Sequence, residues 1–186
     1  MSERENVPGP RLPSSVAEQI INLPDFCDRA GVCVDLARKL SLVLETNGIE
    51  YSIVSFRPKT DDKIKEKLTR RGGASLMRDI YGVRFITEEK DRLKIAKIVQ
   101  DAFPFTPESF PDGMPSVRDY ADPKVRDFVR SNFNPGISSR HSAMHINIVF
   151  LREGSSLFDI AEVQILTPEE MRIFKETREE YESGRN

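Results

Sequence analysis

The stretch from Asp79 to Thr87, DIYGVRFIT, decides how the rest of the chain is interpreted. Its β-branched and aromatic residues predict a strand over 80–87. Asp79 stands at the start of that strand, and carboxylate oxygens are ligands that Mg²⁺ prefers. Arg84 lies inside the strand, where a guanidinium is costly to bury without an anionic partner. The alternative is an ordinary edge strand that carries an arginine and an aspartate cap.

A second informative strand is predicted over 157–166, which contains FDIAEVQIL. Side chains alternate between the two faces of a strand, so Glu162 and Gln164 share one face, opposite Val163. A glutamate that faces inward from an apolar strand indicates a ligand or a base, whereas on a solvated face it is ordinary. The preceding strand, predicted over 144–151, forms a hairpin with this one.

A basic segment lies between the first of these strands and a strand predicted over 51–56. From 57 to 78 there are eight lysines and arginines against three acidic residues. Thr60 or Asp61 can cap a helix that ends at Gly72. One face of this helix carries Lys63, Lys67, Arg70 and Arg71. Such a face can hold a triphosphate, although many similar faces are merely solvated.

The remaining pattern is mostly helical. Helices are predicted over 15–23, 28–46, 88–102, 122–131 and 168–183, and loops over 103–121 and 132–143. Residues 1–13, with three prolines, are expected to form a flexible N-terminal arm. The order of elements predicts a mixed sheet with helices packed on it, in an α+β or single-layer α/β fold.

Composition excludes several classes of protein. The length of 186 residues suits one domain, predicted over 14–186. No apolar stretch approaches the ~20 residues of a membrane span, and no apolar signal core is present near the N-terminus, so we expect a cytoplasmic protein. Two cysteines and two histidines make a zinc site improbable. A net charge of −2 argues against bulk nucleic-acid binding.

Four motifs occur in a fixed order along the chain. They are Arg57-Pro58-Lys59, the run from Asp79 to Arg84, Arg118-Asp119-Tyr120 with Pro123-Lys124, and Glu162-Val163-Gln164-Ile165. In this order they resemble the RelA/SpoT family of synthetase domains, which make the alarmone (p)ppGpp. The resemblance covers about residues 51–171.

The resemblance implies a nucleotidyltransferase-like mixed sheet flanked by helices. It implies a GTP diphosphokinase-like reaction that moves pyrophosphate from ATP to the 3′-hydroxyl of GDP or GTP. Asp79, Glu162 and Gln164 would be catalytic, with Mg²⁺ on Asp79 and Glu162. The residues implied to bind ATP are Arg57, Lys59, Lys67, Arg70 and Arg71. Those implied to bind the acceptor are Arg84, Lys124, His141 and His145.

The chain departs from the family near the acceptor. Members of the family carry the motif Gly-Tyr-x-Ser-Leu-His. The best match here runs from Arg140 to His145, where His141 occupies the position of the tyrosine and Ala143 that of the serine. Two alternatives therefore stand beside the leading interpretation. One is a toxin-like relative that modifies tRNA 3′ ends or adenine nucleotides, and the other is a non-catalytic nucleotide sensor. The charged last helix also allows a homo-oligomer.

Overall fold

The computed structural model describes residues 10–71, 76–133 and 142–183. Its helices are α1 (Val16–Ile21), α2 (Phe26–Thr46), α3 (Asp61–Arg71), α4 (Arg92–Ala102), α5 (Pro123–Asn132) and α6 (Pro168–Ser183), with a 3-10 turn, η1 (Glu89–Asp91), before α4. Its strands are β1 (Ser52–Pro58), β2 (Tyr81–Ile86), β3 (Val117–Asp119), β4 (Met144–Leu151) and β5 (Phe158–Leu166). None of the helices in these described ranges has an apolar stretch long enough to cross a membrane.

The five strands form one mixed sheet in the order β1-β2-β5-β4-β3. β2 and β5 are parallel, and the other neighbouring pairs are antiparallel. The chain segment that links β2 to β5 contains α4, β3, α5 and β4. Asp79 lies just before β2 and Glu162 lies in the middle of β5, and these two strands are neighbours in the interior of the sheet.

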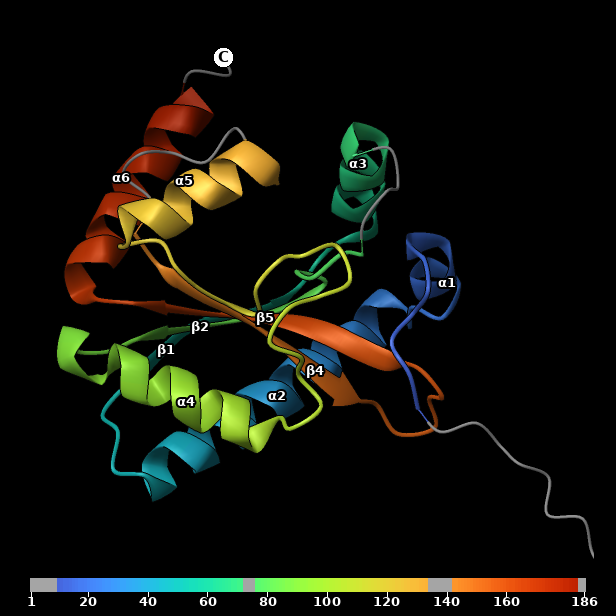
Figure 1. Ribbon diagram of the computed structural model, residues 1–186, viewed down its shortest axis with the longest axis horizontal. Coiled ribbons are helices and arrows are strands. Elements are labelled where there is room, and N and C mark those ends of the chain that lie inside the picture. The colour runs from blue at the N-terminus through green and yellow to red at the C-terminus, as the bar shows by residue number, and fades with distance from the viewer. Residues whose placement is uncertain (1–9, 72–75, 134–141, 184–186) are drawn as a thin grey trace, which may run out of the picture.

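One face of the sheet is apolar and is covered by α2 and α4, as Figure 1 shows. Leu40 of α2 and Val99 of α4 are fully buried there, against Val83 and Val163 of the two central strands. Alternation along β2, β4 and β5 sends every second residue into this core. The opposite face is left for polar side chains, and α3, α5 and α6 lie on that side (Figure 1).

Side-chain caps set the starts of several helices. Ser15 accepts a hydrogen bond from Glu18 N at the start of α1, and Asp25 accepts one from Asp28 N at the start of α2. Thr60 Oγ1 accepts from Lys63 N before α3. The α2 helix thus begins two residues earlier than the helix predicted over 28–46.

The prediction of a mixed α+β sheet flanked by helices is confirmed. The hairpin of β4 and β5 is also confirmed, since Met144 pairs with Ile165 and Leu151 with Phe158. The prediction that 103–121 is entirely loop was wrong, because β3 lies within it. A three-residue edge strand is too short to show alternation, and its stability comes from pairing with β4.

Candidate functional site

Two rows of side chains cross the polar face of the sheet. The first row follows the strand pairing through Arg57 on β1, Gly82 on β2, Glu162 on β5 and Asn147 on β4. Glu162 therefore lies on a central strand, with a glycine on one side and a fully buried asparagine on the other.

The second row lies two residues along each strand. It consists of Ser55, Arg84, Gln164, His145 and Arg118, one from each of the five strands. Period two puts it on the same face as the first row. We call the residues of both rows the polar face.

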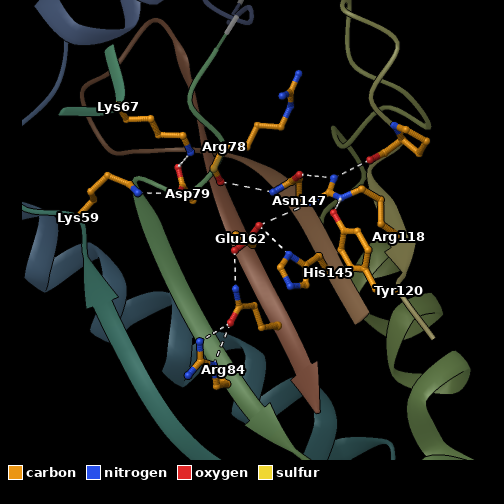
Figure 2. A network of polar contacts seen from close by, with 12 residues as sticks. Lys59, Lys67, Arg78, Asp79, Arg84, Arg118, Tyr120, His145, Asn147 and Glu162 are labelled. Carbon is orange, nitrogen blue, oxygen red and sulfur yellow. Dashed lines mark hydrogen bonds and ion pairs between the residues drawn. The ribbon is translucent and has the colours of Figure 1, made fainter. Parts of the chain in front are cut away.

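Asp79 precedes β2 and is bound by two lysines, as Figure 2 shows. Its Oδ1 lies 2.5 Å from Lys67 Nζ of α3, and its Oδ2 lies 2.6 Å from Lys59 Nζ. Burial raises the pKa of Asp79, and the charge of Glu162 raises it further. The charges of Lys67 and Lys59 outweigh both and hold the pKa below its usual value, so Asp79 is ionised.

Glu162 is the carboxylate of the polar face, and three side chains contact it (Figure 2). Its Oε2 lies 3.0 Å from His145 Nδ1 and 3.7 Å from Arg118 Nη2, and its Oε1 accepts a 2.7 Å hydrogen bond from Gln164 Nε2. Burial raises the pKa of Glu162, but His145, Arg118 and Gln164 outweigh it and the pKa is strongly lowered. A carboxylate with so low a pKa suits a metal ligand better than a general base at neutral pH.

Gln164 is itself held by Arg84, which donates to its Oε1 from Nε at 2.9 Å and from Nη2 at 2.6 Å. The Arg84 guanidinium also lies 4.2 Å from the ring centroid of Phe174 in α6. Arg84 is only partly buried and lines the cavity described below, so its charge keeps access to solvent although its partner Gln164 is neutral.

A cavity of about 400 Å³ opens between the polar face and the start of α3. Its lining brings together the basic motif before α3 and both carboxylates. The lining residues are Ser55, Arg57, Pro58, Lys59, Thr60, Lys63, Asp79, Gly82, Val83, Arg84, Glu162 and Gln164. Lys67 lines a smaller adjoining pocket of about 110 Å³ with Lys59 and Asp79. Cations and carboxylates around one cavity are suited to a phosphorylated substrate.

The structure brings some of the expected site residues together and leaves others apart. Arg57, Lys59, Asp79, Arg84, Glu162 and Gln164 line the cavity, Lys67 reaches it through Asp79, and His145 reaches it through Glu162. Lys124 is exposed at the start of α5 and does not line this cavity. Arg70 and Arg71 lie in α3, but their side chains, like the whole of His141, lie outside what the structure describes.

The two carboxylates of the cavity are the candidate ligands for a metal ion. In the described ranges no group of three or more His, Cys, Asp or Glu side chains could hold a metal by itself. Asp79 and Glu162 nevertheless face one cavity, and each contributes an ionised carboxylate. Mg²⁺ commonly takes one or two carboxylates and completes its shell with water and substrate phosphates. The pair therefore fits a metal that arrives with a phosphorylated substrate.

Sequence reasoning missed Asn147 as part of the site and gave Arg118 no role. Arg118 Nη1 donates to Asn147 Oδ1 at 2.6 Å, and Arg118 Nε donates to Tyr120 Oη at 3.1 Å. The signal for Asn147 was present, because alternation in the predicted strand over 144–151 places it beside His145, opposite the apolar residues. Arg118 lay in a segment interpreted as loop, so no face could be assigned to it.

No protein-family model and no curated protein sequence matches this chain. Solved structures do match it. Small alarmone synthetase 2 from Bacillus subtilis is 20% identical, with 87% of this chain and 80% of that chain covered and a TM-score of 0.56. The chain has the fold of the small alarmone synthetases.

Two further structures with this small alarmone synthetase fold agree. Small alarmone synthetase 1 from Bacillus subtilis, bound to its product pppGpp, is 20% identical over 86% of this chain and 78% of that chain, with a TM-score of 0.52. A GTP pyrophosphokinase family protein from Streptococcus pneumoniae is 18% identical over 90% of this chain and 78% of that chain, with a TM-score of 0.50. The fold that the four motifs implied is therefore confirmed.

Proposed function

We propose that this protein is a pyrophosphokinase that transfers pyrophosphate from Mg²⁺-bound ATP to the 3′-hydroxyl of GDP or GTP. The observation that carries the proposal is the cavity itself. It is lined by both carboxylates and by Arg57, Lys59 and Lys63, on the fold of the small alarmone synthetases. One of those synthetases is described with its product pppGpp bound, which supports a guanine nucleotide as acceptor.

The donor nucleotide is proposed to bind on the α3 side of the cavity. Arg57 and Lys59 flank the end of β1, and Lys67 approaches from α3. Arg70 and Arg71 follow on the same helix. Guanidinium and ammonium groups donate several charge-assisted hydrogen bonds to clustered phosphate oxygens, so this set suits a triphosphate.

Asp79 and Glu162 are proposed to hold Mg²⁺, which would neutralise charge on the phosphates as the pyrophosphoryl group leaves AMP. Lys59 and Lys67 now occupy the oxygens of Asp79, and they are proposed to bind the phosphates when nucleotide enters. Gln164 keeps Glu162 aimed at the cavity through its hydrogen bond to Oε1. Phosphoryl-type transfer depends mainly on such positioning and charge neutralisation.

The acceptor is proposed to bind on the β4 side, near His145, with Arg84 directed at its phosphates and His141 at its base. Lys124 is exposed at the start of α5, so it would contact an acceptor that extends from the cavity to this helix. A tRNA 3′ end or an adenine nucleotide presents the same 3′-hydroxyl, so the chemistry at Glu162 and Asp79 would be unchanged.

The test is to incubate the protein with γ-labelled ATP, Mg²⁺ and GDP, GTP, ADP, ATP or bulk tRNA in separate reactions, and to follow the label. Transfer to GDP or GTP supports the proposal. Transfer of label only to ADP, ATP or tRNA would mean that the acceptor is a different molecule, while the proposed pyrophosphate transfer would stand. Binding of ATP with no transfer to any acceptor would favour a nucleotide sensor and contradict the proposed enzyme.

A further inference from the structure

We propose that Asn147 is a positioning residue that fixes the distance between the two carboxylates of the site. It does so by bridging Arg118, which holds Glu162, and the backbone of Arg78, which leads directly into Asp79. The inference rests on the proposed function only in taking Asp79 and Glu162 as the pair that holds a divalent metal.

The first arm of the bridge runs to Glu162. Asn147 is the pairing partner of Glu162 on the neighbouring strand, and it is fully buried. Its Oδ1 accepts a 2.6 Å hydrogen bond from Nη1 of Arg118, whose Nη2 lies 3.7 Å from Glu162 Oε2. The same Nη1 donates to Pro115 O at 2.8 Å. These contacts leave the Arg118 guanidinium little freedom. Asn147 therefore helps to orient Arg118, and Arg118 in turn orients the Glu162 carboxylate.

The second arm runs to the segment that carries Asp79. Asn147 Nδ2 donates to Arg78 O at 3.4 Å, and this carbonyl belongs to the peptide that joins Arg78 to Asp79. Figure 2 shows Asn147 between this carbonyl and Arg118. Asp79 precedes β2 and has no strand pairing of its own to fix it. The hydrogen bond from Asn147 therefore ties the Asp79 backbone to β4, the strand next to Glu162.

The bridge is also fixed to the edge of the sheet. The backbone N–H of Asn147 donates to Ser116 O at 2.7 Å, and Arg118 Nε donates to Tyr120 Oη at 3.1 Å. Asn147 is too deeply buried to touch a nucleotide, so it acts through the residues that it holds. Partners of metal ligands typically contribute 10–100-fold to metal affinity or activity.

The experiment measures metal binding without turnover. Asn147→Leu has a similar shape but neither donor nor acceptor. Mn²⁺ binding is measured by electron paramagnetic resonance in the presence of an ATP analogue with a methylene group between its α and β phosphorus atoms. We expect the Kd for Mn²⁺ to rise about tenfold, the lower end of the range for direct partners of metal ligands, because Asn147 contacts neither carboxylate itself. The affinity for the analogue in EDTA should change by less than about twofold.

Ile148→Ala is the matched control, because Ile148 is equally buried on β4 but faces the apolar core. This variant destabilises the protein by a cavity and should leave the Kd for Mn²⁺ unchanged. Arg118→Lys is the second variant, since it keeps the charge but loses the fork that reaches Asn147, Tyr120 and Glu162 together. Arg118→Lys is measured in place of Asn147→Leu if the latter does not fold, and the same rise in the Kd for Mn²⁺ is expected.

A Kd within twofold of the parent in the folded variants would overturn the inference. An equal rise in Ile148→Ala, or a parent that binds no Mn²⁺ with the analogue, would overturn it as well. The two proposals fail separately. A parent that binds Mn²⁺ but transfers no pyrophosphate contradicts the proposed function alone, and an active parent with an unaffected Asn147→Leu contradicts only the positioning role.

Discussion

Lys67 Nζ lies 2.5 Å from Asp79 Oδ1, which ties the basic helix α3 directly to the segment that opens β2. The ion pair is shielded from solvent, since the Lys67 side chain is only 13% exposed. A phosphate that recruits Lys67 must draw it away from Asp79, and a metal on Asp79 would replace the lost charge. Metal and ATP are therefore expected to assist each other's binding.

Lys67→Ala is expected to weaken ATP binding by roughly 10–100-fold, because one charge-assisted hydrogen bond contributes about 1.5–3 kcal/mol. Rising salt should weaken binding in the parent as well. Isothermal titration with ATP and Mg²⁺ measures both effects. Lys65→Ala is the matched control, since Lys65 is exposed on α3, and it should change affinity by less than about twofold. Equal losses at 65 and 67 would indicate a merely solvated surface.

Asp79→Asn is expected to reduce pyrophosphate transfer by about 100-fold or more, because the amide keeps the shape but loses the charge for the metal. The melting temperature should fall as well, because Lys59 and Lys67 lose the carboxylate that they share, so transfer is measured well below it. ATP binding in EDTA should not weaken, since Lys59 and Lys67 are released from their carboxylate. Turnover at the parental rate would remove Asp79 from the mechanism.

Glu162→Gln is expected to lose transfer to a similar extent, since it removes the second carboxylate of the cavity. Val163→Ile changes the adjacent residue, which is fully buried on the opposite face of β5. It should reduce stability by about 1–3 kcal/mol through overpacking while transfer persists. The rate of each variant, measured well below its melting temperature, separates the two effects. An active Glu162→Gln enzyme would leave Asp79 as the sole carboxylate ligand.

The pH dependence of stability follows from the lowered pKa of Glu162. The unfolded chain binds a proton on this residue near pH 4.3, whereas the folded chain does so only at much lower pH. Ionised Glu162 therefore stabilises the fold fully above the unfolded pKa, and this contribution is lost as the pH falls below it. Melting curves from pH 7 to 3 should show a steeper loss in the parent than in Glu162→Gln. Parallel losses in the two proteins would contradict the assignment.

Arg92 is expected to be important for stability rather than chemistry. It is 2% exposed and pairs with Glu170 of α6 at 2.8 Å and with Asp119 of β3 at 2.9 Å, and it also donates to Ser142 O. Arg92→Met would leave those acidic partners without their cation, at a cost of about 3–5 kcal/mol. Urea unfolding measures this cost. A loss below about 1 kcal/mol would show that the cluster relaxes into solvent.

The sequence predicted the parts of the site that depend on local periodicity. Period two in the strand over 157–166 was enough to place Glu162 and Gln164 on one face, and helical spacing placed Lys63 and Lys67 on one face of α3. Both statements hold because they concern neighbours within one element. Alternation along the strand predicted over 144–151 likewise separates its apolar residues from His145 and Asn147, and Met144, Ile146 and Ile148 are buried in the apolar core.

The parts that the sequence did not predict depend on pairing between distant segments. The residues around Arg118 do not indicate that it lies on a three-residue strand close to Glu162. This strand, β3, is stabilised by its pairing with β4 rather than by its own residues. The bond between Asn147 and Arg78 O joins residues 69 positions apart. Lys124 shows the same limit in reverse. The motif match assigned it to the acceptor site, whereas the structure has it exposed at the start of α5 and outside the lining of the cavity.

The most direct test of the central claim is to follow the phosphorus atoms of ATP by nuclear magnetic resonance during a reaction with GTP and Mg²⁺. The account predicts equal amounts of AMP and of a new pyrophosphate ester at the 3′ position of GTP, with neither product in Asp79→Asn. Formation of ADP and phosphate, or of AMP and free pyrophosphate with GTP unchanged, would contradict pyrophosphate transfer to a nucleotide.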